Sequence, residues 1–288
     1  MTTSRNNQPT LLPYRVHGGY ERLIAVPEKL DLYIELLEEL YNRYNRREFV
    51  HPDPLEFLYD YEESADREVV ALVASSLSYG KVAQILKSVG AVLERMGPSP
   101  AGFLRVSSSR SLEDGFRGFK HRMTTGRDLA RVLAGAQTAI ERYGSLNACF
   151  VSNMGPDDET VIPALSSFVA EISGESGGAC GFHLPSPVKG SACKRLNLFL
   201  RWLVRKDEVD PGGWEGIPAA RLVVPLDTHM YKICFKLGLT RRKQADLRTA
   251  LEITSRFRDI APEDPVKYDF ALTRLGIRDD VFFGQIPY

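Results

Sequence analysis

The chain has 288 residues, of which 43% are apolar and 26% are charged, so it is neither a disordered tail nor a fibre. Basic and acidic residues are equal in number, at 37 each, which excludes a uniformly basic protein. Its four cysteines are separated by 31, 13 and 41 positions, a spacing that excludes a compact zinc finger and argues against a disulfide framework.

Residues 1–27 are polar and contain three prolines, which predicts a loosely ordered N-terminal arm. This segment lacks the apolar core of a signal peptide. No apolar run in the chain approaches the ~18 residues of a membrane span. We therefore expect a cytoplasmic protein with no membrane partner.

From residue 28 onward, apolar residues recur at helical spacing. Residues 65–96 carry this pattern twice around an interruption at Ser78-Tyr79-Gly80, which predicts two helices and a short turn. The last predicted helix has Asp264 as N-cap, Pro265 as first residue and Gly276 beyond its end. The other predicted helices span residues 30–41, 129–143, 161–172, 191–205, 228–237 and 243–257, and the last spans 265–275. With no strand pattern or internal repeat, we expect an all-α fold with a single helical domain over 28–288.

Charge is unevenly distributed along the chain. Residues 28–68 hold 13 acidic and 5 basic residues, whereas 186–206 hold 6 basic and no acidic residue. A second basic stretch, 232–248, holds 6 basic residues and 1 acidic residue. Such stretches can contact phosphate, although runs of charge are more often solvated helix faces.

Asp227 lies in the sequence V-V-P-L-D-T-H-M-Y-K. Pro225 prevents a helix before it, and apolar residues at helical spacing begin just after it, so Asp227 is the expected N-cap. Backbone N–H groups at that position favour an ionised carboxylate. Asp227 is therefore either a structural cap only or a cap that also serves chemistry.

Lys194 lies in the sequence K-G-S-A-C-K-R-L-N-L-F-L-R-W, within the first turn of a predicted helix. The positive end of the helix dipole is unfavourable for a protonated amine. A lysine nucleophile needs that effect, because only the neutral amine attacks carbon. Helical spacing also places Lys194 on one face with Arg201 and Arg205, so a solvated basic face is the competing interpretation.

Together these motifs resemble the helix-hairpin-helix DNA glycosylases, the superfamily of endonuclease III and the 8-oxoguanine glycosylases. V-K-G-S-A-C-K-R-L is similar to the family motif L-P-G-V-G-R-K-T-A, which sets Lys194 on the nucleophilic lysine. L-D-T-H matches the family motif V-D-T-H, which sets Asp227 on the catalytic aspartate. Ser76-Leu77-Ser78 resembles the start of the substrate-facing turn, and L-T-R-L-G at 272–276 resembles the last core helix. The similarity extends over residues 30–277, and the chain looks like an uncharacterised bacterial group similar to archaeal 8-oxoguanine glycosylases.

The resemblance implies a two-lobed helical fold with a helix-hairpin-helix-like element and a cleft between the lobes. Residues 65–180 would form the middle lobe, and 28–64 with 181–288 the lobe that carries Lys194 and Asp227. The implied function is excision of a damaged base from double-stranded DNA, 8-oxoguanine first, with Schiff-base lyase activity at the abasic site. We expect a nucleoid-associated monomer without a metal or other cofactor.

The resemblance and the charge pattern also assign binding residues. Trp202 falls on the apolar side of its predicted helix, so we expect it in the core, whereas Trp214 lies in a predicted loop and is the better candidate to stack on a base. The base-pocket candidates are Ser78, Tyr79 and Trp214. The DNA-binding candidates are Lys189, Gly190, Ser191, Arg201, Arg205, Arg241, Arg242 and Lys243.

Three functional hypotheses remain open at this point. The first is a bifunctional glycosylase and lyase that uses both Lys194 and Asp227. The second is a monofunctional glycosylase in which Asp227 activates water. The third is a non-catalytic DNA-binding protein of the same fold. The matching lysine and aspartate favour the first, whereas the missing Leu-Pro-Gly-x-Gly hairpin favours the third.

Overall fold

The computed structural model describes residues 27–174 and 183–278. The N-terminal arm expected over 1–27 lies outside these residues except for Pro27, which begins α1. The α-helices of the described residues are α1 (Pro27–Tyr44), α2 (Ser64–Ser76), α3 (Val82–Met96), α4 (Pro100–Val106), α5 (Ser109–Gly115), α6 (Gly126–Tyr143), α7 (Leu146–Val151), α8 (Ile162–Ser173), α9 (Lys194–Val204), α10 (Thr228–Lys236), α11 (Leu247–Ile260) and α12 (Asp269–Arg278). Short 3-10 turns are η1 (Arg47–Phe49), η2 (Pro54–Asp60), η3 (Pro187–Lys189) and η4 (Ala219–Arg221).

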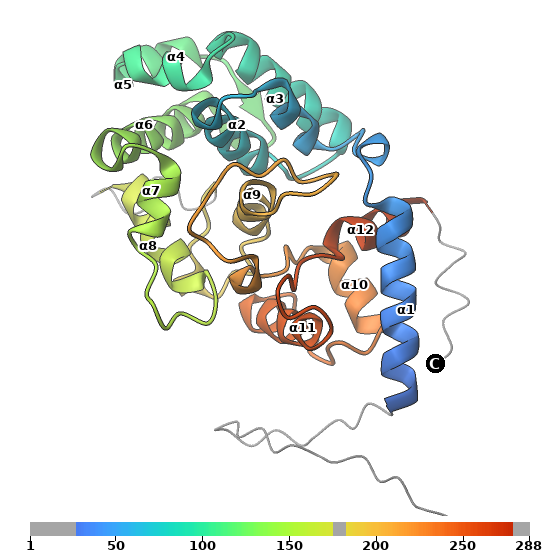
Figure 1. The fold of residues 1–288 in the computed structure, drawn as a ribbon. Helices are drawn as coiled ribbons and strands as arrows, with labels where there is room; N and C mark the ends of the chain where they lie inside the picture. Colours follow the sequence, from blue (N-terminus) through green and yellow to red (C-terminus); the bar gives the residue numbers. More distant parts are fainter. Residues whose placement is uncertain (1–26, 175–182, 279–288) are drawn as a thin grey trace, which may run out of the picture.

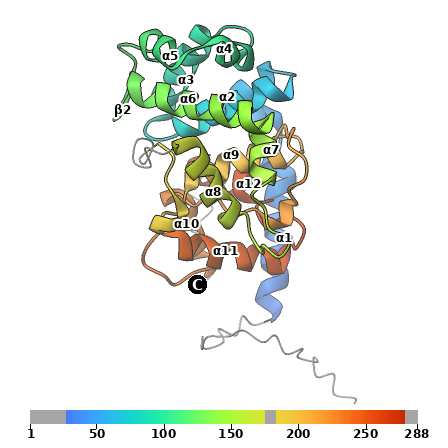
Figure 2. The same cartoon turned by 90° about the vertical axis from the view of Figure 1, so that its left-hand side faces the viewer.

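The helices form two layers with α9 between them. Figure 2 shows α2 to α6 in the upper layer and α10, α11 and α1 in the lower layer. In Figure 1, α9 is seen along its axis between α2 and the α10–α12 group. The buried apolar side chains of both layers belong to one hydrophobic cluster. The mainly helical fold is therefore confirmed, and the division into two lobes stays a prediction.

The helix pattern of the sequence agrees with the structure in most of the chain. The interruption at Ser78-Tyr79-Gly80 is the turn between α2 and α3, with Gly80 at φ +101°. The expected absence of strands is wrong in one place: β1 (Lys120–His121) pairs antiparallel with β2 (Thr124–Thr125) in a small hairpin before α6. Two residues per strand are too few to produce an alternating sequence pattern.

The start and end of the last helix differ from the prediction. α12 begins at Asp269 and runs to Arg278, so Asp264 is not its N-cap and Gly276 lies within it. Asp264 instead accepts hydrogen bonds from Nε of Arg205 at 2.9 and 3.1 Å. The sequence alone does not distinguish a carboxylate that caps a helix from one that pairs with an arginine, and here Asp264 pairs with Arg205.

Candidate active site

Lys194 and Asp227 face one another in a pocket of about 320 Å³. The Lys194 Nζ atom lies 3.8 Å from Asp227 Oδ2, and each side chain is 31% exposed. The pocket is lined on one side by the α2–α3 turn, with Ser78 and Gly80, and on the other by α9, α10 and α12. Two residues that are 33 positions apart in the sequence are thus brought together at a site open to solvent.

Lys194 owes its position to an abrupt helix start. Gly190 and Cys193 both adopt left-handed backbone conformations, at φ +77° and +48°, and α9 begins directly after them. Lys194 is therefore the first residue of α9, three residues later than the predicted start. At this position the side chain lies at the N-terminal end of the helix, where the backbone N–H groups of the first turn have no partner within the helix.

Asp227 is the N-cap of α10, as predicted. Its Oδ1 accepts hydrogen bonds from the backbone N–H groups of His229 and Met230, at 2.9 and 2.8 Å. Because Oδ1 is occupied by the cap, Oδ2 is the oxygen that faces the Lys194 amine. His229, in the first turn of α10, is exposed and lines the same pocket.

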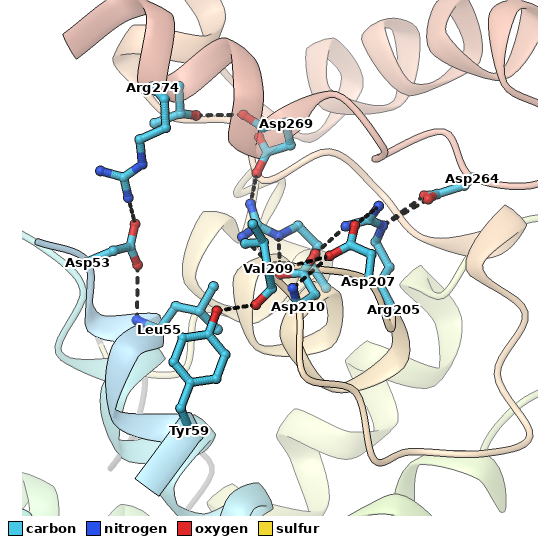
Figure 3. A network of polar contacts seen from close by, with 12 residues as sticks. Asp53, Leu55, Tyr59, Arg205, Asp207, Val209, Asp210, Asp264, Asp269 and Arg274 are labelled. Atoms are coloured by element: carbon cyan, nitrogen blue, oxygen red, sulfur yellow. Dashed lines mark hydrogen bonds and ion pairs between the residues drawn. The ribbon is translucent and has the colours of Figure 1, made fainter. Parts of the chain in front are cut away.

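The pocket lining also includes charged residues that the sequence analysis did not select. Asp53 precedes η2 and pairs with Arg274 of α12, as Figure 3 shows. Asp269 of α12 also lines the pocket. Burial raises the Asp269 pKa to about 6, against the opposing effect of the Arg201 guanidinium, with which it pairs. The pattern at 272–276 indicated a helix here but not which of its faces meets the pocket.

Arg201 and Arg205 do not form an exposed basic face, which corrects the prediction that they bind DNA phosphates. Their exposed fractions are 3% and 5%. Both pair with the buried Asp210, and Arg201 also pairs with Asp269. Arg205 has two further carboxylate partners, Asp207 at 2.8 Å and Asp264 at 2.9 Å. Figure 3 shows this network, which satisfies both guanidinium groups inside the protein.

Trp214 is part of the core, which corrects its assignment as a base-stacking residue. It is 5% exposed, and its ring lies 5.0 Å from that of Phe199 and 5.8 Å from that of Phe150, between centroids. Its Nε1–H donates to Oε2 of the buried Glu68 at 3.1 Å. Trp202 is 1% exposed, so its expected core position is confirmed.

The two other base-pocket candidates differ in position. Ser78 lines the pocket, and its hydroxyl donates to the Ala74 carbonyl at 2.7 Å. Tyr79 points away from the pocket toward the β1–β2 hairpin, where its hydroxyl donates to the His121 carbonyl at 2.8 Å. Its ring also lies 5.1 Å from the Arg195 guanidinium carbon. Tyr79 thus joins the turn to the hairpin and to α9.

The remaining DNA-binding candidates come from two segments that the fold places next to each other. Lys189 and Gly190 are exposed in the turn before α9, and the Gly190 carbonyl accepts a hydrogen bond from the backbone N–H of Leu247 at 3.0 Å. The Ser191 hydroxyl accepts from the Cys193 backbone N–H at 3.2 Å. Arg241 and Lys243 are exposed just before α11, whereas Arg242 is half-buried and pairs with Asp246.

The comparisons with known proteins give one family. Residues 53–278 match the model of the family described as "Protein of unknown function (DUF2400)". The chain belongs to this family. No curated protein and no solved structure matched the chain. Among the described residues, no helix combines the length and the apolar character needed to cross a membrane.

Proposed function

We propose that this DUF2400 protein excises a damaged base from double-stranded DNA and cleaves the strand at the resulting abasic site. The observation that carries the proposal is the 3.8 Å approach of the Lys194 amine to the Asp227 carboxylate at the mouth of a pocket. The motif resemblance sets the same two residues on the nucleophilic lysine and catalytic aspartate of helix-hairpin-helix glycosylases. The motif resemblance and the spatial juxtaposition are independent observations.

The residues of the pocket suit a nucleobase better than a phosphate. Its lining holds three carboxylates, Asp53, Asp227 and Asp269, and three cations, Lys194, Arg201 and Arg274, so its formal charge is balanced. Phe270, Pro54 and Ile85 add apolar surface to the same lining. A neutral, flat and polar group fits such a site. Moving a base into it from the stack costs a few kcal/mol, least where the base is damaged.

The chemistry follows from the two facing groups. The neutral Lys194 amine attacks the sugar carbon that carries the base, forming an N–C bond as the base departs with the electrons of the glycosidic bond. The Asp227 carboxylate stabilises the positive charge on the sugar and accepts the proton that the amine loses. Opening of the sugar ring gives a Schiff base. Loss of a proton from the neighbouring carbon then expels the 3′ phosphate, and water releases the lysine.

Borohydride trapping tests this proposal directly. The protein is incubated with duplex DNA carrying 8-oxoguanine, then with other damaged bases and with a preformed abasic site, in the presence of borohydride. We expect a covalent protein–DNA adduct, because borohydride reduces the Schiff base to a stable amine. Lys194→Gln should abolish the adduct, whereas Lys206→Gln, at an exposed residue just after α9, should leave it unchanged.

The outcomes separate the functional hypotheses. An adduct that persists in Lys194→Gln contradicts the nucleophile assignment. Base release without an adduct, lost in Asp227→Asn, indicates the monofunctional glycosylase. DNA binding with neither adduct nor base release across the whole panel of substrates indicates a non-catalytic protein.

A further inference from the structure

A further group of exposed basic residues lies outside both basic stretches that the sequence analysis selected. Residues 81–142 hold 11 basic and 5 acidic residues, a net charge of +6. Four of the basic residues surround the β1–β2 hairpin, and we call them the hairpin patch. They are Lys81 at the start of α3, Lys120 in β1, Arg122 at the hairpin turn and Arg127 in the first turn of α6.

The hairpin patch borders the pocket that holds Lys194 and Asp227. Gly80 lines that pocket, and a Cβ atom added to Gly80 would lie 2.7 Å from Cδ of Arg122, so the arginine stem crosses directly over this residue. Arg122 adopts a left-handed backbone at φ +53°, which non-glycine residues rarely do. Its guanidinium carbon lies 6.0 Å from the centre of the Tyr79 ring. The turn geometry thus holds a cation at the pocket rim.

No carboxylate of the described residues neutralises the charges of the hairpin patch. All four side chains are exposed, and none of the four forms an ion pair within residues 27–174 and 183–278. By contrast, Arg117 pairs with Asp114. Asp128, the acidic residue nearest in sequence, accepts from the backbone N–H and the hydroxyl of Thr125 at the cap of α6.

We infer that the hairpin patch binds the phosphate backbone of the duplex DNA whose base enters the pocket. This inference rests on the proposed function and adds the surface that holds the duplex. Unpaired cations at the rim of a pocket are positioned to contact phosphates that flank a displaced nucleotide. Figure 2 shows β2, at the hairpin, and α10, which Asp227 caps, on the same side of the molecule.

A matched pair of double variants tests the inference. Lys120→Gln with Arg127→Gln removes two charges from the hairpin patch. Arg105→Gln with Arg110→Gln removes two exposed charges from α4 and α5 of the same layer, and these two residues also form no ion pair among the described residues. Affinity for an undamaged duplex is measured against salt concentration. Each lost phosphate contact reduces the slope of log affinity against log salt by about 0.9, so the patch variant should lose about 2.

The control variant should keep the slope of the unmodified protein. Equal slopes in all three proteins, or equal losses in both variants, overturn the inference, as does an unmodified protein that does not bind DNA. Thermal unfolding of both variants establishes that they remain folded. The borohydride adduct is a separate readout. A reduced slope in the patch variant without an adduct from the unmodified protein supports DNA binding by the hairpin patch and contradicts the lyase activity. An adduct together with unchanged slopes supports the lyase activity and contradicts DNA binding by the hairpin patch.

Discussion

The two ends of α9 hold basic side chains in opposite environments. At its first residue, Lys194 is partly exposed and faces one carboxylate at 3.8 Å. At its C-terminal end, Arg201 and the C-cap Arg205 are buried and pair with four carboxylates between them. One end therefore leaves an amine accessible for reaction, and the other uses its cations to hold the surrounding segments together.

The two ends of α9 differ because the loop that follows the helix covers only its C-terminal end. Asp210 follows α9 closely, because the loop turns back on the helix: the backbone N–H groups of Gly212 and Trp214 donate to the Trp202 and Leu203 carbonyls, at 3.0 and 2.8 Å. That return covers the arginines and supplies their partners. In the part of the chain that the structure describes, no such return covers the first turn, which lines the pocket.

The largest expected effect comes from removing the shared partner at the buried end. Asp210→Ala leaves two buried guanidinium groups short of a carboxylate. Removing one partner of a buried ion pair typically destabilises a protein by about 3–5 kcal/mol. We expect a loss of that size in the free energy of unfolding, measured by urea titration. Lys206→Ala, at an exposed position, is the control and should change it by less than about 0.5 kcal/mol; a loss below about 1 kcal/mol for Asp210→Ala would contradict this account of the buried end.

A smaller effect is expected beside the Lys194 end of α9, at Asp227. Asp227→Ala removes the N-cap of α10 and should lower the free energy of unfolding by about 1 kcal/mol. Asp227→Asn keeps an oxygen that can cap the helix, so we expect nearly unchanged stability with loss of base release. The two variants therefore separate capping from chemistry. Equal destabilisation of both would show that the negative charge, and not the cap, stabilises this end.

The smallest effect concerns two buried histidines beside the segment that leads into α9. Burial lowers the pKa of His121 and His183 below 6.5 in the folded state. The unfolded chain then binds more protons as the pH falls through 6.5, so this contribution to stability is present at pH 7.5 and decreases toward pH 5.5. Thermal unfolding at these two pH values should show the decrease. We expect His121→Gln to reduce it; an equal decrease in the variant and the unmodified protein would contradict this account.

The sequence predicted most of the helices and the N-cap at Asp227 because both depend on local rules. Asp227 at an N-cap and the turn at Ser78-Tyr79-Gly80 are encoded within a few residues. The environments of Arg201 and Arg205 are not, because burial of a guanidinium depends on carboxylates that only the folded chain brings close. Asp264 lies 59 positions after Arg205 and Asp269 lies 68 positions after Arg201, and no periodicity relates them to α9. The same holds for Trp214, whose partner Glu68 is 146 positions away.

The chain between Lys194 and Asp227 is held by hydrogen bonds over residues 209–214 and is buried again from Leu222 to Leu226. Val209 accepts from the Tyr59 hydroxyl, Gly213 from Ser64 at 3.1 Å, and Glu68 holds the Trp214 indole. Beyond Trp214, Glu215 and Gly216 are exposed. We expect relatives to differ in length at Glu215–Gly216 and to keep a constant length from 207 to 214. Insertions and deletions in this protein family would thus occur at Glu215–Gly216, where they leave the distance between the Lys194 amine and the Asp227 carboxylate unchanged.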